Sequence, residues 1–409
     1  MRSFILTTIT IALLFSIASC NSTPQPIVEG IPTVTKLVTQ PTPITCTSFA
    51  VSSTPESLTA TFPAITSADH IRGPESAPVT IVAYEDLQTE LSAQLSNVIK
   101  QLSDENPNKI RYVSRIFPLS GAKDKTVLAT QAVEAANKQN MFWELHDLLF
   151  SQQESWTNLT PEDFEQWVTA QASALGMDVD QFQADLKSEA VFNLIKDYFD
   201  EGQDAGVFGV PLVIINGEIY LGPQDYASLN DIVQLILLGE RHFTECPPML
   251  VQSTKQYIAT LHTEKGDVVI QLFADKAPFT VNSFVFLAQN GWYDNITFHR
   301  VVPDLYAQTG DPSGTGKGTP GYYVVTEILP DLTFDKPGMV AMVNSGPDSS
   351  GSQFFITYDA APQFDGQYTI FGQVLNGMDV LESLTPRDAQ LGVATPPGDK
   401  LLSITIEEK

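Results

Sequence analysis

The sequence predicts a multidomain protein in which an α/β domain with a helical insertion precedes a closed antiparallel β-barrel capped by two helices. The chain has 409 residues, which is more than one hydrophobic core usually organises, so two folded domains are expected. Strand and helix patterns alternate over residues 65–243, whereas strand patterns dominate residues 257–409. The net charge of −26 disfavours nucleic acid as a partner, because no basic face is expected.

The chain begins with the features of an export signal. Arg2 precedes an apolar run over residues 4–17, which is shorter than a membrane-spanning helix. The next residues end in Cys20 and resemble the lipobox of bacterial lipoproteins, which implies a signal peptide over residues 1–20 and lipidation of Cys20. We therefore expect an extracytoplasmic protein that its lipid holds at the cell membrane. Cleavage of a plain secretory signal nearby is the alternative.

The remaining cysteines leave two alternatives open. Residues 21–64 are rich in Pro, Thr and Ser and predict an extended tether. If Cys20 carries lipid, Cys46 and Cys246 form one pair in a compartment that permits disulfides. Cys46 precedes the α/β region and Cys246 follows it, so a disulfide would join the two ends of that region. Two free thiols are the alternative.

Residues 65–243 have the order strand, helix, strand, helical insertion, hairpin and helix. The predicted strands are residues 79–84 and 110–116 and a hairpin over 212–221; the predicted helices run to Ser103, over 123–200 and over 225–238. The hairpin is expected because Asn216-Gly217 suits the positive φ angles of a type I′ turn.

This region resembles the periplasmic disulfide-oxidase branch of the thioredoxin superfamily. The matching segments are residues 73–78, Val210-Pro211 and residues 215–217. The resemblance implies a cis-proline loop at Pro211 and a groove beside it for an extended peptide. Where the family carries Cys-x-x-Cys, this chain has Thr89 and Ser92. Hydroxyl groups cannot exchange a disulfide, because a thiolate must attack and leave. We therefore expect a redox-inactive scaffold or binding module.

Residues 257–409 follow a short linker over residues 245–256. In this last region strand patterns replace the alternation of strands and helices. The predicted strands are residues 257–262, 268–273, 338–343, 353–357, 369–374 and 402–406. Val281, Phe284, Val285 and Ala288 recur at helical spacing and place one apolar stripe on a helix. Residues 378–384 predict a second helix. Many strands, frequent Gly and Pro turns and two helices are typical of a capped, closed antiparallel barrel.

Several ordered motifs in this region resemble those of the cyclophilin-type peptidyl-prolyl cis-trans isomerases. They are residues 298–303, 308–311 with the Gly-rich run 312–321, 344–347, 351–356 and 365–372. The resemblance covers essentially all of residues 257–409. It implies isomerisation of proline-containing segments of exported polypeptides, a reaction that requires no cofactor and no metal.

The chemistry explains the residue types. Rotation about an X-Pro amide faces a barrier of about 20 kcal/mol, because the nitrogen lone pair is shared with the carbonyl. A catalyst must hold the proline ring in an apolar pocket and donate a hydrogen bond to the nitrogen as the amide twists. Arg300 matches the family's catalytic arginine, Gln308 would support its guanidinium, and Phe355 would form the pocket floor.

The resemblance implies seven further residues in contact with substrate: Leu305, Tyr306, Met342, Asn344, Gln353, Phe364 and Tyr368. His299 lies inside the first motif but is expected to be structural, because the reaction transfers no proton. Leu305, Gln363 and Tyr368 depart from the aromatic, tryptophan and histidine of the best-known members. Leu305 keeps the pocket apolar and Tyr368 keeps a donor at its edge, whereas Gln363 in place of the tryptophan is expected to affect mainly the binding of cyclosporin.

The hypothesis that explains most features is a membrane-anchored foldase for exported proteins. The alternatives are a proline-peptide binding module or chaperone with little or no isomerase turnover, and an interaction protein in which both domains have lost their chemistry. The Gly-rich run at residues 310–318 lacks P-loop spacing, and the five histidines lack metal-ligand spacing.

Overall fold

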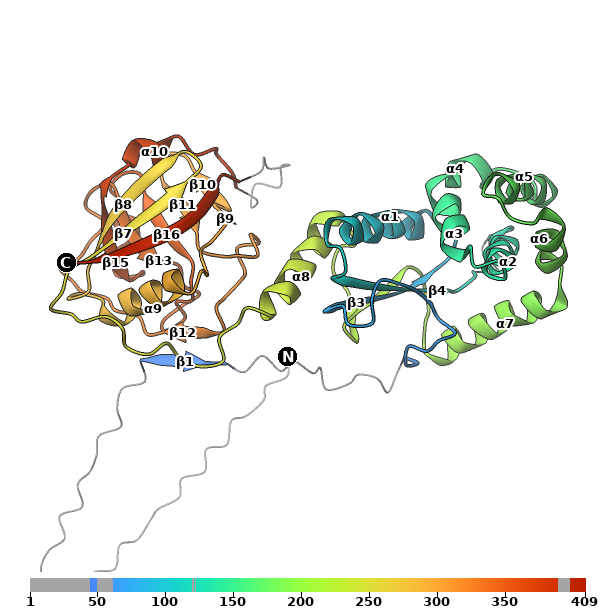
Figure 1. Cartoon of the computed structure of the whole chain (residues 1–409), viewed down its shortest axis with the longest axis horizontal. Coiled ribbons are helices and arrows are strands. Elements are labelled where there is room, and N and C mark those ends of the chain that lie inside the picture. The colour runs from blue at the N-terminus through green and yellow to red at the C-terminus, as the bar shows by residue number, and fades with distance from the viewer. Residues whose placement is uncertain (1–44, 50–61, 120, 122, 389–397) are drawn as a thin grey trace, which may run out of the picture. The chain divides into compact units, whose positions relative to one another are not determined.

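The computed structural model describes residues 45–49, 62–388 except 120 and 122, and 398–409. The predicted signal peptide, the lipidation site at Cys20 and most of the predicted tether lie outside the described residues. We refer to residues 65–243 as the α/β domain and to residues 257–409 as the β domain (Figure 1). No helix in the described part of the chain has the length and apolar character needed to cross a membrane.

A five-stranded sheet of order β2-β4-β3-β5-β6 organises the α/β domain. Its strands are β2 (His70–Arg72), β3 (Val79–Glu85), β4 (Ile110–Ile116), β5 (Leu212–Ile215) and β6 (Glu218–Tyr220). β3 and β4 are parallel and the other pairs are antiparallel. β3 is buried along nearly its whole length, because apolar side chains cover the sheet on both faces.

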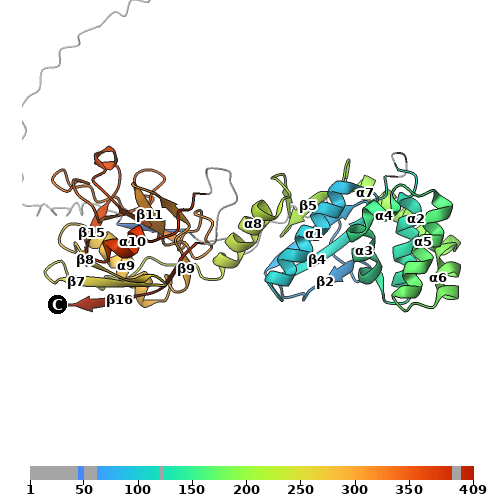
Figure 2. The ribbon, with the colours of Figure 1, turned by 90° about the horizontal axis from the view of Figure 1, so that it is seen from above.

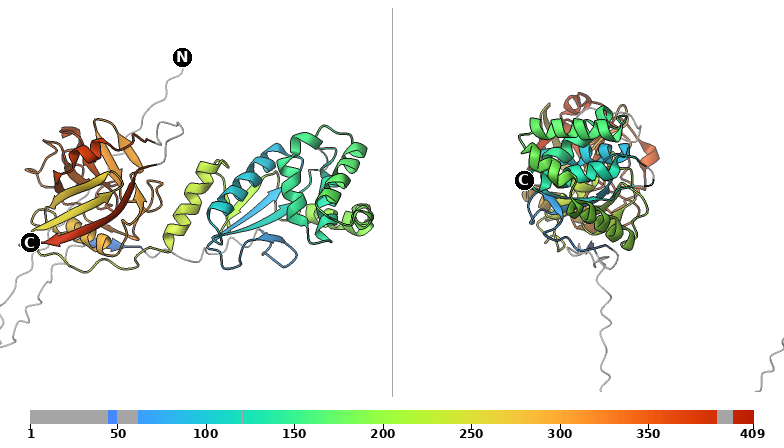
Figure 3. Two further views of the ribbon diagram at one scale, coloured as in Figure 1. Left: turned by 45° about the horizontal axis from the view of Figure 1, so that its top comes forward. Right: turned by 90° about the vertical axis from the view of Figure 1, so that its right-hand side faces the viewer.

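The helices of this domain cover the sheet and form a separate group at one end. They are α1 (Glu90–Glu105), α2 (Thr126–Asn137), α3 (Phe142–Ser151), α4 (Gln153–Trp156), α5 (Pro161–Ala174), α6 (Val179–Leu186), α7 (Glu189–Asp204) and α8 (Tyr226–Gly239). Leu95 of α1 and Leu229 of α8 pack with β3 in one core. Figure 3 shows α1 in blue and α8 in yellow-green. α2, α5 and α6 pack together (Figure 2). The helical insertion predicted over residues 123–200 therefore consists of α2 to α7.

Two local predictions for this domain are confirmed. Asn216 and Gly217, between β5 and β6, have φ angles of 48° and 88°, as the hairpin turn requires. The Val210–Pro211 peptide bond is cis, as the resemblance to the thioredoxin superfamily implied. α1 begins after Thr89, and the buried Ser92 hydroxyl in its first turn accepts a hydrogen bond from the Asp86 backbone N–H at 3.2 Å.

The β domain contains a nine-stranded antiparallel sheet of order β10-β11-β14-β13-β15-β8-β7-β16-β9. Its strands are β7 (Tyr257–Thr263), β8 (Gly266–Leu272), β9 (Ile296–Thr297), β10 (Arg300–Val302), β11 (Tyr306–Thr309), β13 (Met339–Met342), β14 (Phe354–Thr357), β15 (Ile370–Asn376) and β16 (Lys400–Glu408). Residues from both ends of the sheet, Ile296 and Val301, belong to one core. The sheet therefore curls around a single hydrophobic core.

The prediction of a closed barrel is wrong. β10 and β9 end the sheet, and within the described residues they do not pair with each other. Val301 of β10 instead exchanges two backbone hydrogen bonds with Arg387, at 2.6 and 3.0 Å. The returning segment at Arg387 thus occupies the edge of β10 that closure would need.

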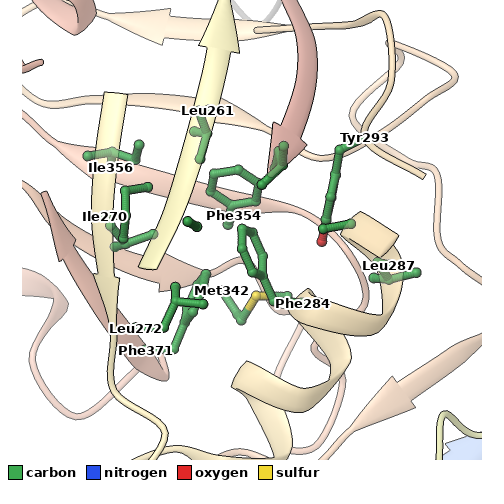
Figure 4. Close-up of a cluster of buried hydrophobic side chains, with 14 of the residues drawn as sticks. Leu261, Ile270, Leu272, Phe284, Leu287, Tyr293, Met342, Phe354, Ile356 and Phe371 are labelled. Carbon is green, nitrogen blue, oxygen red and sulfur yellow. The ribbon is translucent and has the colours of Figure 1, made fainter. Parts of the chain in front are cut away.

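Side chains of alternate residues and of one helix fill this core. Tyr257, Ala259 and Leu261 of β7 point inward, with half-buried residues between them. The helices are α9 (Pro278–Gln289), α10 (Met378–Glu382) and a short 3-10 helix, η1 (Pro362–Phe364). All four residues of the predicted apolar stripe lie buried on α9, which confirms that prediction. Figure 4 shows Phe284 of α9 beside Phe354 and Phe371.

A strand from ahead of the α/β domain also pairs with the β domain. β1 (Cys46–Ser48) runs antiparallel to β12 (Tyr322–Val324). The prediction of an extended tether is therefore wrong for these residues, because their backbone groups have partners in β12. Cys46 and Cys246 form a disulfide, one of the two alternatives that the sequence left open.

Candidate functional site

The three predicted catalytic residues lie in one row across neighbouring strands. Arg300 of β10 is the direct partner of Gln308 in β11, and Gln308 is the partner of Phe355 in β14. Directly opposed residues of antiparallel strands project on the same face. With about 4.8 Å between strands, the row places a cationic group and an apolar ring roughly 10 Å apart, with an amide side chain between them.

Phe355 lies among other aromatic rings. Its ring is only 4% exposed. The surrounding rings have centroids within 5.8 Å of its own and belong to Tyr306, Phe334, Phe364 and Tyr368. Phe334 is fully buried and lies nearly parallel to Phe355, at an interplanar angle of 13°. The other three are half-buried. The arrangement gives an apolar surface with a fixed floor and partly accessible walls.

Arg300 contacts both an aromatic wall and a carboxylate. Its guanidinium carbon lies 5.5 Å from the centre of the Tyr306 ring, within the range of a cation–π interaction. Its Nη2 donates to Asp388 Oδ2 at 3.2 Å. Asp388 lies beside β10 because the neighbouring Arg387 pairs with Val301. The guanidinium is therefore held from two sides, and its side chain remains 27% exposed.

Gln308 belongs to a chain of amide hydrogen bonds. Its Nε2 donates to Gln353 Oε1 at 3.0 Å. Gln353 Nε2 in turn donates to the carbonyl oxygens of Gly316 and Gly318, at 3.1 and 3.0 Å. Both side chains are more than 90% buried. The Gly-rich run identified in the sequence thus orients Gln353, which orients the central residue of the row.

A groove continues from this row. It has a volume of about 310 Å³ and is lined by residues that include Tyr323, Val343, Asn344, Ser349 and Gln353. Val343 also packs against the apolar side chains around Phe355, which include Phe334, Met339, Ala341 and Ile370 and which we call the Phe355 cluster. The groove and the aromatic surface therefore share a wall. Asn344 Nδ2 donates to the Gln367 carbonyl at 3.0 Å, and its Oδ1 accepts from the Gly346 N–H at 3.2 Å. These bonds fix the turn after β13.

The assignment of Met342 to the pocket wall is wrong. Met342 is 1% exposed and pairs with Phe354, whereas Ala341 pairs with Phe355. Figure 4 shows Met342 inside the core, near Phe284 and Phe371. Successive strand residues point to opposite faces, and an assignment displaced by one residue therefore selects the wrong face. Met339 and Ala341 are the residues of β13 that belong to the Phe355 cluster.

The remaining residues that the sequence predicted to contact substrate lie around Phe355 or just before β11. Tyr306, Phe364 and Tyr368 surround Phe355, and Leu305 is half-buried before β11, where its carbonyl accepts from the Tyr358 N–H at 3.0 Å. The sequence analysis missed Phe334, Val343 and Asp388. Val343 could have been found from the alternation in β13. Phe334 and Asp388 lie in segments without a motif, so that the sequence offered no signal for either.

Burial controls the ionisation of the groups beside the row. Burial lowers the pKa of His299, and the positive charges of Arg387 and Arg300 add to this effect against the opposing charge of Asp311. Burial raises the pKa of Tyr306, although the charge of Arg300 opposes the shift. Both groups are therefore expected to be uncharged near neutral pH.

The segment between β3 and α1 in the α/β domain has a different kind of polar cluster. Asp86 is fully buried. One of its carboxylate oxygens accepts from the Gln88 N–H at 2.8 Å, and the other accepts from the Leu119 N–H at 2.7 Å and from the Thr126 hydroxyl. All cysteines of the chain lie outside residues 47–245. Hydrogen bonding within the domain thus satisfies the buried Asp86 carboxylate ahead of α1.

Comparisons with known proteins agree with these two folds. The family model described as cyclophilin type peptidyl-prolyl cis-trans isomerase/CLD matches residues 258–405. The family model described as thioredoxin matches residues 66–234. The chain therefore contains a thioredoxin-like domain ahead of its isomerase-type domain.

Individual relatives match the β domain. Peptidyl-prolyl cis-trans isomerase A of Mycobacterium tuberculosis (strain ATCC 25618 / H37Rv) is 46% identical over 133 residues, 29% of this chain and 73% of that protein. Peptidyl-prolyl cis-trans isomerase-like 1 of Emericella nidulans is 43% identical over 128 residues, 31% of this chain and 79% of that protein. A solved cyclophilin-type isomerase of Cryptosporidium parvum is 32% identical, with a TM-score of 0.35, over 37% of this chain and 98% of that one. Through its C-terminal β domain, the chain belongs to the cyclophilin-type peptidyl-prolyl cis-trans isomerases.

Proposed function

We propose that the protein is an extracytoplasmic, lipid-anchored foldase that isomerises X-Pro bonds in exported polypeptides, with the row from Arg300 to Phe355 as its catalytic centre. The observation that carries this proposal is the direct cross-strand pairing of Arg300 with Gln308 and of Gln308 with Phe355. The reaction needs these three kinds of group next to one another, and the motifs that supply them are separated in the sequence.

The mechanism follows from the charge that develops as the amide twists. Rotation removes resonance, so that the prolyl nitrogen becomes pyramidal and its lone pair becomes available. The proline ring would rest on Phe355, between Tyr306, Phe364 and Tyr368. Arg300 would then donate to the nitrogen lone pair, an interaction that is stronger in the twisted state than in the planar one. Gln308 would contact the substrate carbonyl.

Asp388 and Tyr306 make the arginine effective. A mobile guanidinium would have to be ordered during each turnover, at a cost in conformational entropy. The ion pair with Asp388 and the contact with Tyr306 restrict its positions beforehand. Its Nη2 donates to Asp388, and in the bound state another of the five N–H groups of the arginine would be directed at the substrate.

Peptide isomerisation tests this proposal. The cis and trans forms of an Ala-Pro peptide interconvert in tens of seconds or more without a catalyst, and NMR exchange measures acceleration directly. We expect the full chain to accelerate exchange, and we expect Arg300→Ala to lower kcat/KM by about 100-fold without changing the circular dichroism spectrum. A chain that binds the peptide but does not accelerate exchange would support the alternative of a binding module.

The anchoring part of the proposal rests on the N-terminal sequence, in which Cys20 closely follows the apolar run over residues 4–17. Metabolic labelling with a fatty acid followed by mass spectrometry tests it. We expect label on the wild-type protein and none on a Cys20→Ser variant. Label that persists in the variant, or an unlabelled wild-type protein in the soluble extracytoplasmic fraction, would contradict the anchor and leave the isomerase assignment untouched.

For the α/β domain we propose a role as a redox-inactive spacer or client-binding platform. Thr89 and Ser92 at the start of α1 cannot exchange a disulfide. The exposed Phe208, before the cis-proline, and the exposed Leu91, in α1, offer apolar contacts to an unfolded chain. A Phe208→Ala/Leu91→Ala variant should bind an unfolded client less tightly, while its turnover of a short proline peptide should match the wild type.

A further inference from the structure

β1 lies ahead of the α/β domain in the sequence but pairs with the β domain. Its pairing with β12 extends over residues 45–49. Cys46 is opposite Val324, the Val325 N–H donates to the Thr45 carbonyl at 3.2 Å, and the Phe49 N–H donates to the Gly321 carbonyl at 3.1 Å. The whole α/β domain and the first part of the β domain separate these two strands in the sequence. β1 is therefore an addition to the β domain that no local sequence pattern requires.

β12 contributes directly to the groove beside the catalytic row. Tyr323, at its centre, lines the groove together with Val343, Asn344 and Gln353. Gln353 accepts the hydrogen bond of Gln308, and Val343 touches the Phe355 cluster. A substrate whose proline occupies the aromatic surface is a polypeptide, so its flanking residues must continue along neighbouring surface. The groove that contains Tyr323 adjoins the proline surface.

β1 fixes the position of Tyr323. Thr47 pairs with Tyr323 along the backbone, and the Phe49 ring lies 5.0 Å from the Tyr323 ring at an interplanar angle of 43°. Among the described residues, β1 is the one strand that pairs with β12; a single bridge joins Val324 to Ser350. Tyr322 and Val324 anchor β12 in the core, whereas Tyr323 between them points to the opposite face and has Phe49 as an aromatic neighbour. The position of the Tyr323 side chain in the groove wall therefore depends on how well β1 is held.

The Cys46–Cys246 disulfide holds β1 against the β domain. Cys246 lies in a segment fixed to the β domain: the Phe243 N–H donates to the Pro320 carbonyl at 2.8 Å, and the Asn282 amide bonds the backbone of Pro248 and Leu250. The bond from Cys46 to Cys246 spans 200 residues. Without it, pairing of β1 would have to overcome the entropy of closing that long connection.

We propose that residues 45–49 form the outer support of a substrate groove, and that the Cys46–Cys246 disulfide holds this support in place, so that β1 determines affinity for residues flanking the proline. This inference rests on the proposed isomerase function and deepens it. Phe49 acts through Tyr323 and is a positioning residue, since it does not touch the row from Arg300 to Phe355. The predicted ligand is an extended polypeptide longer than the X-Pro unit.

The test compares two probes that differ only in length. A blocked Ala-Pro dipeptide reaches the proline surface alone, whereas a decapeptide with Ala-Pro at its centre also fills the groove. For the full chain we measure kcat and KM by NMR exchange, and Kd by calorimetry. Phe49→Ala removes the contact with Tyr323, and a Cys46→Ser/Cys246→Ser variant releases β1. Phe192→Ala is the matched control, because it removes an exposed phenylalanine of α7.

We expect both β1 variants to raise the KM and Kd for the decapeptide about fivefold, with kcat unchanged. The dipeptide should keep the wild-type kcat/KM within about twofold, and the control should match the wild type for both probes. Equal losses for the two probes would indicate a general structural effect and overturn the inference, as would unchanged decapeptide affinity in Phe49→Ala. A wild-type chain that binds both peptides without turnover would contradict the isomerase function alone, because the ratio of the two affinities still tests β1.

Discussion

The α/β domain and the β domain both bury polar side chains, but they use them differently. In the α/β domain, hydrogen bonds from Gln88, Leu119 and Thr126 converge on the carboxylate of Asp86. In the β domain, Gln308 and Gln353 are almost as deeply buried. Their hydrogen bonds connect the Gly-rich run to the row that begins with the partly exposed Arg300.

This difference shows how a buried polar network can serve either stability or function. A network that satisfies its own donors and acceptors fixes a turn and presents nothing to a ligand. A network that ends at a partly exposed cation or aromatic surface orients groups that remain available. Fold alone therefore does not settle activity, and substitutions in the two networks should be separable by what they change.

The largest effect is expected from Met342, which tests the boundary between core and site within the β domain. Met342→Ala should lower the unfolding free energy of this domain by about 3 kcal/mol, because it leaves a cavity among buried apolar side chains. Hydrogen exchange measured by mass spectrometry would show faster exchange in β13 and β14 and unchanged exchange in the α/β domain.

The neighbouring Val343 provides the control for this experiment. Val343 lies on the opposite face and borders the groove, so Val343→Ala should change peptide affinity more than stability. If Met342→Ala instead weakened peptide binding while stability remained unchanged, the assignment of Met342 to the core would be contradicted.

A smaller but still substantial effect is expected from Asp86 in the α/β domain. Asp86→Ala removes the acceptor of two backbone N–H groups and one hydroxyl, and the unfolding free energy should fall by about 2 kcal/mol. Domain-resolved hydrogen exchange would report the loss. Isomerase kcat/KM should not change, because the network ends within its own domain. A parallel loss of turnover would show that the two domains are functionally coupled.

Asp388 tests the network of the β domain. Here activity should change and stability should not, the reverse of what is expected for Asp86. Asp388→Ala frees Arg300 from its ion pair, so kcat/KM should fall about tenfold, equivalent to about 1.4 kcal/mol, with little change in stability. Asp388→Glu retains the charge and should recover part of the loss. Equal turnover in all three proteins would mean that the ion pair does not position the guanidinium.

Several features of both domains could be predicted from residue patterns in the sequence. The predictions that failed did so for physical reasons. The apolar stripe of α9 and the Asn216-Gly217 turn follow from local periodicity and backbone preference, and the structure has both. β10 and β11 were not predicted as strands, although they carry Arg300 and Gln308, because three or four residues give too short a pattern to recognise. β1 and Asp388 depend on contacts with segments that are remote in the sequence, which no local pattern encodes.

The smallest effect concerns two buried histidines, one in each domain. Burial alone would lower the pKa of His146, but hydrogen bonds with Asp147 and Glu85 outweigh it and raise that pKa. Burial lowers the pKa of His299. An unfolded histidine has a pKa near 6.5. On acidification from pH 8 to pH 6, His146 therefore binds a proton at a higher pH in the folded α/β domain than in the unfolded domain. His299 binds its proton at a higher pH in the unfolded β domain than in the folded domain.

The two domains should consequently respond to pH in opposite directions. His146 stabilises the α/β domain fully below about pH 6.5 and loses this contribution as the pH rises through its raised pKa. His299 has the reverse effect, so the β domain loses stability as the pH falls below about 6.5. Domain-resolved hydrogen exchange at pH 8 and pH 6, corrected for the intrinsic pH dependence of exchange, measures both. His146→Gln and His299→Gln should each reduce the response of one domain alone. Within the α/β domain, burial lowers the pKa of His242, which opposes the contribution of His146. A shared response that is unchanged by both substitutions would locate the pH dependence in other groups.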